Sequence, residues 1–91
     1  MSYNYQTEKP GLLAPDNIPK LIEARDKILA IVKKAGAISG GAAMSQWPGG
    51  GVSWQMMAVA DWMVEQGDLR EVEQRREPTG QHRVYMEAYN R

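Results

Sequence analysis

The side chains best suited to contact an anion lie near the C-terminal end of the sequence. Arg75, Arg76 and Arg83 are close together there, and His82, the only histidine, lies among them. Several guanidinium groups at one place are typical of a surface that contacts nucleic-acid phosphates. The predicted candidates for contact with a DNA backbone are these four residues together with Lys33 and Lys34.

Catalytic or metal chemistry finds little support in this sequence. His82 has no carboxylate or nucleophile in a recognisable arrangement around it, and the chain has no cysteine. With one histidine and no thiolate we expect no zinc site, no other metal and no cofactor. The stretch "PGGGVS" precedes a helix but lacks the lysine and the spacing of a phosphate-binding loop. We therefore expect a protein that is not an enzyme.

Composition is that of a small soluble domain. Hydrophobic residues make up 43% of the chain, and 11 basic residues balance 11 acidic ones, so the net charge is zero. A dedicated nucleic-acid binder normally carries a basic excess. No apolar run reaches the roughly 18 residues of a membrane span, and the first residues lack a secretion-signal pattern. These features predict a cytoplasmic chain without a membrane partner.

Hydrophobic spacing and breaker residues divide the chain into an arm and one domain. The clearest helix has Ile18, Leu21, Ile22, Ile28, Leu29 and Val32 at three- and four-residue spacing. Glycines make the second helix short and weak, and Gly67 ends the third. We expect an extended N-terminal arm at 1–15 and a domain at 16–91, with helices at about 18–35, 39–47 and 53–66 and strands at about 69–76 and 81–88.

The two strands are expected to form a hairpin. The residues "EPTG" suit its turn, since Pro78 presets one backbone angle and Gly80 accepts a positive φ. Pairing outward from this turn places Val72 opposite Met86. Val72, Val84 and Met86 would then share the buried face. The outward face would carry Glu71, Glu73 and Glu87.

The stretch "MAVADWMVEQGDLREVEQRREPTGQHRVYME" resembles the third helix and wing of the winged helix-turn-helix superfamily. The matching parts are Met63, Glu65, Gln66, Gly67, Leu69 and the hairpin around 78–80. The resemblance covers about residues 18–88 and implies a mostly α, α+β fold: a three-helix winged helix-turn-helix with a C-terminal two-stranded β-hairpin wing. It also implies DNA binding and a role in transcription regulation. Fold alone does not fix function, so this implication is an expectation.

In that superfamily's docking geometry the third helix lies in the major groove. Helical spacing gathers Val52, Met56, Val59, Ala60 and Met63 on the side that faces the core. The candidate outward surface comprises Ser53, Trp54, Gln55, Met57, Ala58, Asp61 and Trp62, with Glu65 beyond them. Only Gln55 is a usual base reader, and the helix has no lysine or arginine. Sequence-specific reading by this helix is therefore poorly supported.

Three interpretations of this surface are open. Trp54 and Trp62 could be ordinary core residues covered by the arm or by the 37–51 segment. The surface could bind a protein partner, because tryptophan and methionine are common at interfaces. It could also meet DNA. The arm, with Tyr3, Tyr5, Leu12 and Leu13, could be a solvated tail, cover the core or act as a dimer strap. The function predicted for the chain is a regulatory module that binds DNA through its wing or, alternatively, a protein-interaction adaptor.

Overall fold

The N-terminal segment forms a short helix rather than an extended arm. In the computed structural model, which describes residues 3–50, 54–72 and 83–88, helix α1 spans Tyr5–Leu12. Asn4 begins it, because its side chain accepts a hydrogen bond from the Thr7 backbone N–H at 3.2 Å. Pro10 lies inside the helix and has no N–H to donate to the preceding turn. The helix was not expected from the sequence, because a proline and a glycine interrupt its pattern.

A short 3-10 turn, η1 (Pro15–Asn17), leads directly into the longest helix, α2 (Ile18–Ala35). The bounds of α2 confirm the predicted helix 18–35. Leu21, Ala24, Ile28 and Val32 form its buried stripe, whereas Ile18 is 38% exposed. Gly36 ends α2 with a φ of 90°, a left-handed backbone conformation that glycine adopts without a steric penalty.

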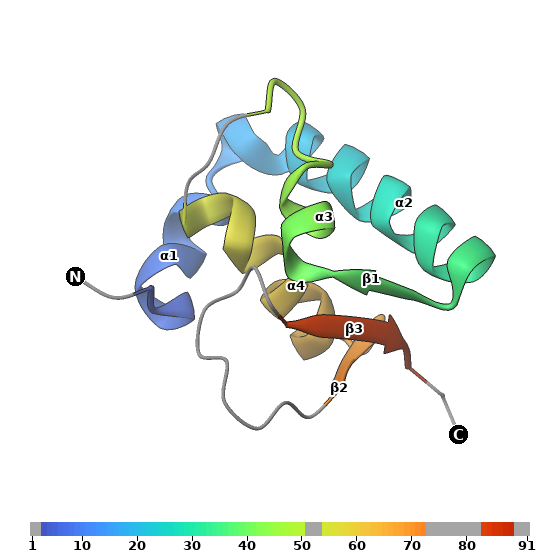
Figure 1. Cartoon of the computed structure of the whole chain (residues 1–91). Helices are drawn as coiled ribbons and strands as arrows, with labels where there is room; N and C mark the ends of the chain where they lie inside the picture. The colour runs from blue at the N-terminus through green and yellow to red at the C-terminus, as the bar shows by residue number, and fades with distance from the viewer. Residues whose placement is uncertain (1–2, 51–53, 73–82, 89–91) are drawn as a thin grey trace.

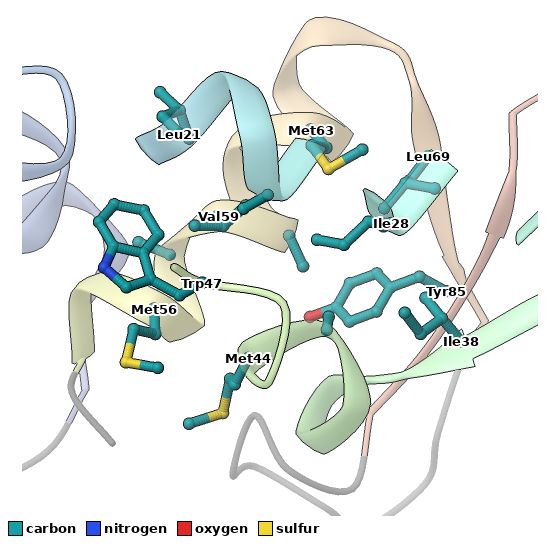
Figure 2. Close-up of a cluster of buried hydrophobic side chains, with 14 of the residues drawn as sticks. Leu21, Ile28, Ile38, Met44, Trp47, Met56, Val59, Met63, Leu69 and Tyr85 are labelled. Atoms are coloured by element: carbon teal, nitrogen blue, oxygen red, sulfur yellow. The ribbon is translucent and has the colours of Figure 1, made fainter. Parts of the chain in front are cut away.

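Strand β1 (Ala37–Ser39) and helix α3 (Gly40–Met44) follow α2. The strand was not expected from the sequence, and α3 is shorter than the predicted 39–47 helix. Ser39 ends the strand and caps the helix, since its hydroxyl accepts from the Ala42 N–H at 3.1 Å. Trp47, just after α3, is buried and packs into the core beside Met56 (Figure 2).

Helix α4 (Trp54–Gln66) runs through the middle of the molecule (Figure 1). Met56, Val59, Ala60 and Met63 are buried, which confirms the predicted core side of this helix; Val52 lies outside the described residues. The helix packs against α1, α2, α3 and the sheet. Gly67, with a φ of 91°, ends it as predicted.

In the part of the chain that the structure describes, the sheet has three strands rather than the two expected of a hairpin wing. Strands β2 (Leu69–Val72) and β3 (Val84–Glu87) pair antiparallel, and β1 adds to the other edge of β3, giving the order β1-β3-β2. The described residues therefore form a mostly helical α+β fold with four α-helices and one antiparallel sheet. None of the described helices is long and apolar enough to cross a membrane.

The hairpin register differs from the predicted one by two residues. Val72 pairs with Val84 and Arg70 with Met86, whereas the turn expected at 77–80 lies outside the described residues. The predicted buried face was also wrong. Leu69 and Tyr85 are 2% and 1% exposed, while Val72, Val84 and Met86 are only half-buried. Both faces carry apolar residues, so alternation did not decide which one meets the helices.

The sheet packs its buried face on α2 and α4. Figure 2 shows Tyr85 and Ile38 from the sheet beside Ile28 of α2, with Leu69 near Met63. Tyr85 is the largest of the side chains that are almost fully buried. The sheet thus packs on one part of α4, and α1 packs along another side of the same helix (Figure 1).

A leucine pair tests whether α1 is an integral part of this core. Leu12 at the end of α1 is fully buried, whereas Leu13 is half-buried. We expect Leu12→Ala to lower the free energy of unfolding by about 2–5 kcal/mol, because the truncation leaves a cavity. Leu13→Ala is the matched control and should cost clearly less. Equal losses for the two variants in urea denaturation would contradict the placement of α1.

Candidate functional site

The polar groups of α4 are gathered on the side that α1 covers. Tyr3, just before α1, donates its hydroxyl hydrogen to Asp61 Oδ2 at 2.5 Å. Tyr5 donates to Glu65 Oε1 at 2.6 Å, and Lys9 Nζ lies 3.0 Å from the same carboxylate. Both carboxylates of α4 therefore have partners in the N-terminal segment.

The same covering extends to the start of α4. Gly11 lies so close to Gln55 that a β-carbon at position 11 would clash with the Gln55 amide nitrogen. Asn17 donates to the Gly11 carbonyl at 2.8 Å and holds this part of the chain in place. Gln55, the one base-reading residue type expected on this helix, is thus packed against α1.

Arg83 joins the sheet to α4. Its Nη1 atom lies 3.3 Å from Asp61 Oδ1, and its Nε lies 2.8 Å from Glu71 Oε2. The side chains of Arg83 and Asp61 are 25% and 15% exposed. Because Tyr3 also binds Asp61, the segment before α1, the helix α4 and the residue before β3 meet at one carboxylate. We call Tyr3, Asp61, Glu71 and Arg83 the Asp61 cluster.

The protonation states of this cluster follow from its burial. Desolvation and the hydrogen bond to Asp61 raise the pKa of Tyr3 well above its ordinary value, so the phenol stays a neutral donor. Burial opposes the charge on Arg83, but Tyr85, Asp61 and Glu71 outweigh it and raise the Arg83 pKa. The cluster therefore holds one guanidinium between two carboxylates and leaves it no free charge for a phosphate.

The candidate DNA-backbone residues do not form one described surface. Arg83 belongs to the Asp61 cluster, and Arg75, Arg76 and His82 lie outside the described residues. Lys33 and Lys34 are exposed at the end of α2, next to the end of the sheet where Ala37 pairs with Met86. The segment between β2 and β3 leaves the sheet at its other end, where Val72 pairs with Val84.

The candidate surface of the third helix is covered more than the sequence suggested. Ala58 is fully buried, and Trp54, Gln55, Met57, Asp61 and Trp62 are all half-buried. Ser53 lies outside the described residues. Met57 and Trp62 pack against the core. Among the open interpretations, covering by the N-terminal segment accounts for Gln55 and Asp61, because α1 and Tyr3 contact them directly.

Sequence reasoning missed Tyr3, Tyr5, Lys9 and Glu71 as members of this site. Asn4, a strong helix-starting residue, was the available signal for α1. Nothing in the local pattern pairs residues about sixty positions apart. No group of three or more metal-ligating side chains occurs among the described residues. Comparisons with protein-family models, curated proteins and solved structures give no significant match to this chain.

A substitution at Asp61 measures how much the Asp61 cluster contributes to the free energy of unfolding. Asp61→Asn keeps an acceptor for Tyr3 but removes the charge that balances half-buried Arg83, so we expect a loss of about 1–3 kcal/mol in unfolding free energy. Asp26→Asn is the matched control, because Asp26 is 62% exposed and pairs with its sequence neighbour Arg25. The control should lose less than about 1 kcal/mol. If Asp26→Asn lowers the free energy of unfolding as much as Asp61→Asn does, the structural role of the cluster is contradicted.

The contact between Glu65 and α1 is expected to weaken at low pH. The hydrogen bond from Tyr5, and then that from Lys9, lower the pKa of Glu65. Since the folded-state pKa lies below the unfolded value of about 4.3, this stabilisation is complete above that pH. It is lost as the pH falls through the folded-state value. The protection of the α1 amides against hydrogen exchange, taken relative to the intrinsic exchange rate at each pH, should therefore fall in acid, and Glu65→Gln should abolish that fall. An unaltered acid response in Glu65→Gln would contradict the assignment.

Proposed function

We propose that the chain is a small, non-enzymatic regulatory binding module of winged-helix type that associates with nucleic acid through its β2–β3 hairpin segment. The observation that carries the proposal is the element order. Helices α2, α3 and α4 followed by the β2–β3 pair reproduce the order that the winged helix-turn-helix resemblance implies. The confirmed bounds of α2 and the core side of α4 add support.

The proposed contact is to the nucleic-acid backbone rather than to bases. Helix α4 presents Asp61 and Glu65 and no basic residue, and α1 packs over these carboxylates. Carboxylates repel phosphate, and base reading needs donors and acceptors free to reach a groove. Arg75, Arg76 and His82 in the hairpin segment remain as the proposed contacts. Backbone contacts carry little sequence information, so binding should be general.

A mobility shift on generic duplex DNA tests this proposal. The full chain should shift DNA at 50 mM salt and lose the shift by 200 mM, because phosphate contacts release counterions. Arg75→Ala with Arg76→Ala should weaken binding on every DNA sequence. The slope of log K against log salt concentration should become shallower by roughly two. Lys33→Ala with Lys34→Ala is the matched control of equal charge and should change affinity little.

Two outcomes would overturn the proposal. Absence of any shift at 50 mM salt would exclude nucleic-acid binding by this module. Equal weakening by the two double variants would show general charge attraction without a role for the hairpin.

A second function, a protein-interaction adaptor, is favoured by a different observation. The outward face of α4 already holds a helix, α1, through hydroxyl and ammonium donors. A surface that binds a helix of its own chain has the shape and the acceptors to bind a helix of another protein. A chain that gives no DNA shift would fit this second function.

A further inference from the structure

We propose that the face of α4 beneath α1 is a docking surface for a partner protein's helix that carries lysine and hydroxyl donors. Residues 3–10 of this chain are then its intramolecular occupant. This inference rests on the adaptor function and names the partner's chemistry. The docking face is defined by Gln55, Ala58, Asp61 and Glu65.

The docking face has the spacing of a helix-binding stripe. Its residues recur every three or four positions on α4, so they lie along one side of the helix. Ala58 is fully buried at its centre, where its small side chain allows another backbone to approach closely. Gln55 at one end touches Gly11, the position in α1 with no side chain. The middle of the face is therefore shaped for a second helix.

Charge complementarity decides what kind of helix fits. The docking face ends in Asp61 and Glu65, and α4 itself has no basic residue to balance them. Arg83 pairs with Asp61 from the sheet side, and the N-terminal segment supplies further donors: the two phenols of Tyr3 and Tyr5 and the ammonium of Lys9. A nucleic acid cannot replace these donors, since its phosphates would meet the carboxylates. A helix with lysine and hydroxyl side chains can.

The occupant is held by contacts that can exchange. No residue from Tyr3 to Pro10 is fully buried, and the Lys9–Glu65 pair is 33% and 40% exposed. Exposed pairs of this kind contribute little to stability. The buried anchor, Leu12, comes after Pro10 and Gly11, where the helix has already lost one backbone donor. Tyr3 and Tyr5 pack against the core but are only partly buried. Residues 3–10 can thus leave the docking face while Leu12 stays in the core.

A labelled peptide supplies the direct test. The peptide MSYNYQTEKPGL, residues 1–12 of this chain, is titrated in fluorescence anisotropy against two full-length proteins. One is the unchanged chain, and the other carries Tyr3→Phe, Tyr5→Phe and Lys9→Ala. These changes remove the occupant's donors and leave the docking face intact. Because the occupant competes with the peptide, the variant should bind at least tenfold more tightly than the unchanged chain.

Further variants locate the binding. Glu65→Gln, added to the triple variant, should weaken peptide binding at least fivefold. Lys27→Ala, which breaks an exposed pair with Glu23 on α2, should leave the peptide affinity unchanged. Arg75→Ala with Arg76→Ala should also leave peptide affinity unchanged, so a failure of DNA binding stays distinct from a failure here. If the triple variant melts without a cooperative transition, Lys9→Ala alone replaces it, with an expected gain of at least threefold.

Three results would overturn the proposal. The first is equal peptide affinity for the unchanged chain and the variant, and the second is no binding to either. The third is a doubled mass of the triple variant in light scattering, which would make the occupant the N-terminal segment of a second copy rather than a partner's helix.

Discussion

Helix α4 is apolar around most of its circumference, and this constraint governs the arrangement of the other elements. A helix that is hydrophobic on nearly all sides must be buried on nearly all sides. Five of its residues are buried, and they do not lie on one stripe: Met56, Ala58, Val59, Ala60 and Met63. One packed layer cannot cover them. Helix α2, the sheet and α3 cover one side, and α1 covers the other.

Covering the second side brings polar groups into the interface, and each of them finds a partner. No buried side-chain nitrogen or oxygen among the described residues lacks a hydrogen-bond partner. Asp61 shows how this is achieved, because it accepts from Tyr3 on one side and meets Arg83 on the other. An unpaired carboxylate at this place would be costly. The Asp61 cluster is therefore a consequence of burying α4, and Arg83 has a structural role in it.

The elements that depend on local pattern were predictable from the sequence. Helix α2 has a long periodic stripe and a glycine stop, and its bounds follow from those residues alone. The core side of α4 follows from spacing in the same way. The face of the hairpin does not, since Leu69 and Tyr85 on one side compete with Val72, Val84 and Met86 on the other. Only packing against α2 and α4 decides between them.

What sequence reasoning could not supply depends on contacts between distant positions. Strand β1 has three residues, which is too few to show an alternating apolar pattern, and it forms because β3 pairs with it. Tyr3 and Asp61 are 58 positions apart, and no local rule joins a phenol near the N-terminus to a carboxylate on α4. The helix that carries the site could therefore be predicted from the sequence. The N-terminal segment that covers this helix could not.

The absence of basic residues on α4 has a physical explanation in this arrangement. Ala58 is fully buried, so a lysine or arginine at this position would place a long cationic side chain where solvent does not reach it. Carboxylates at Asp61 and Glu65 are accommodated because the N-terminal segment brings donors to them. The charge pattern of α4 thus matches the helix that covers it. A helix built to enter a DNA groove would be under the opposite requirement, with donors directed outward to bases and phosphates. The acidic face of α4 is consequently complementary to the N-terminal segment that covers it.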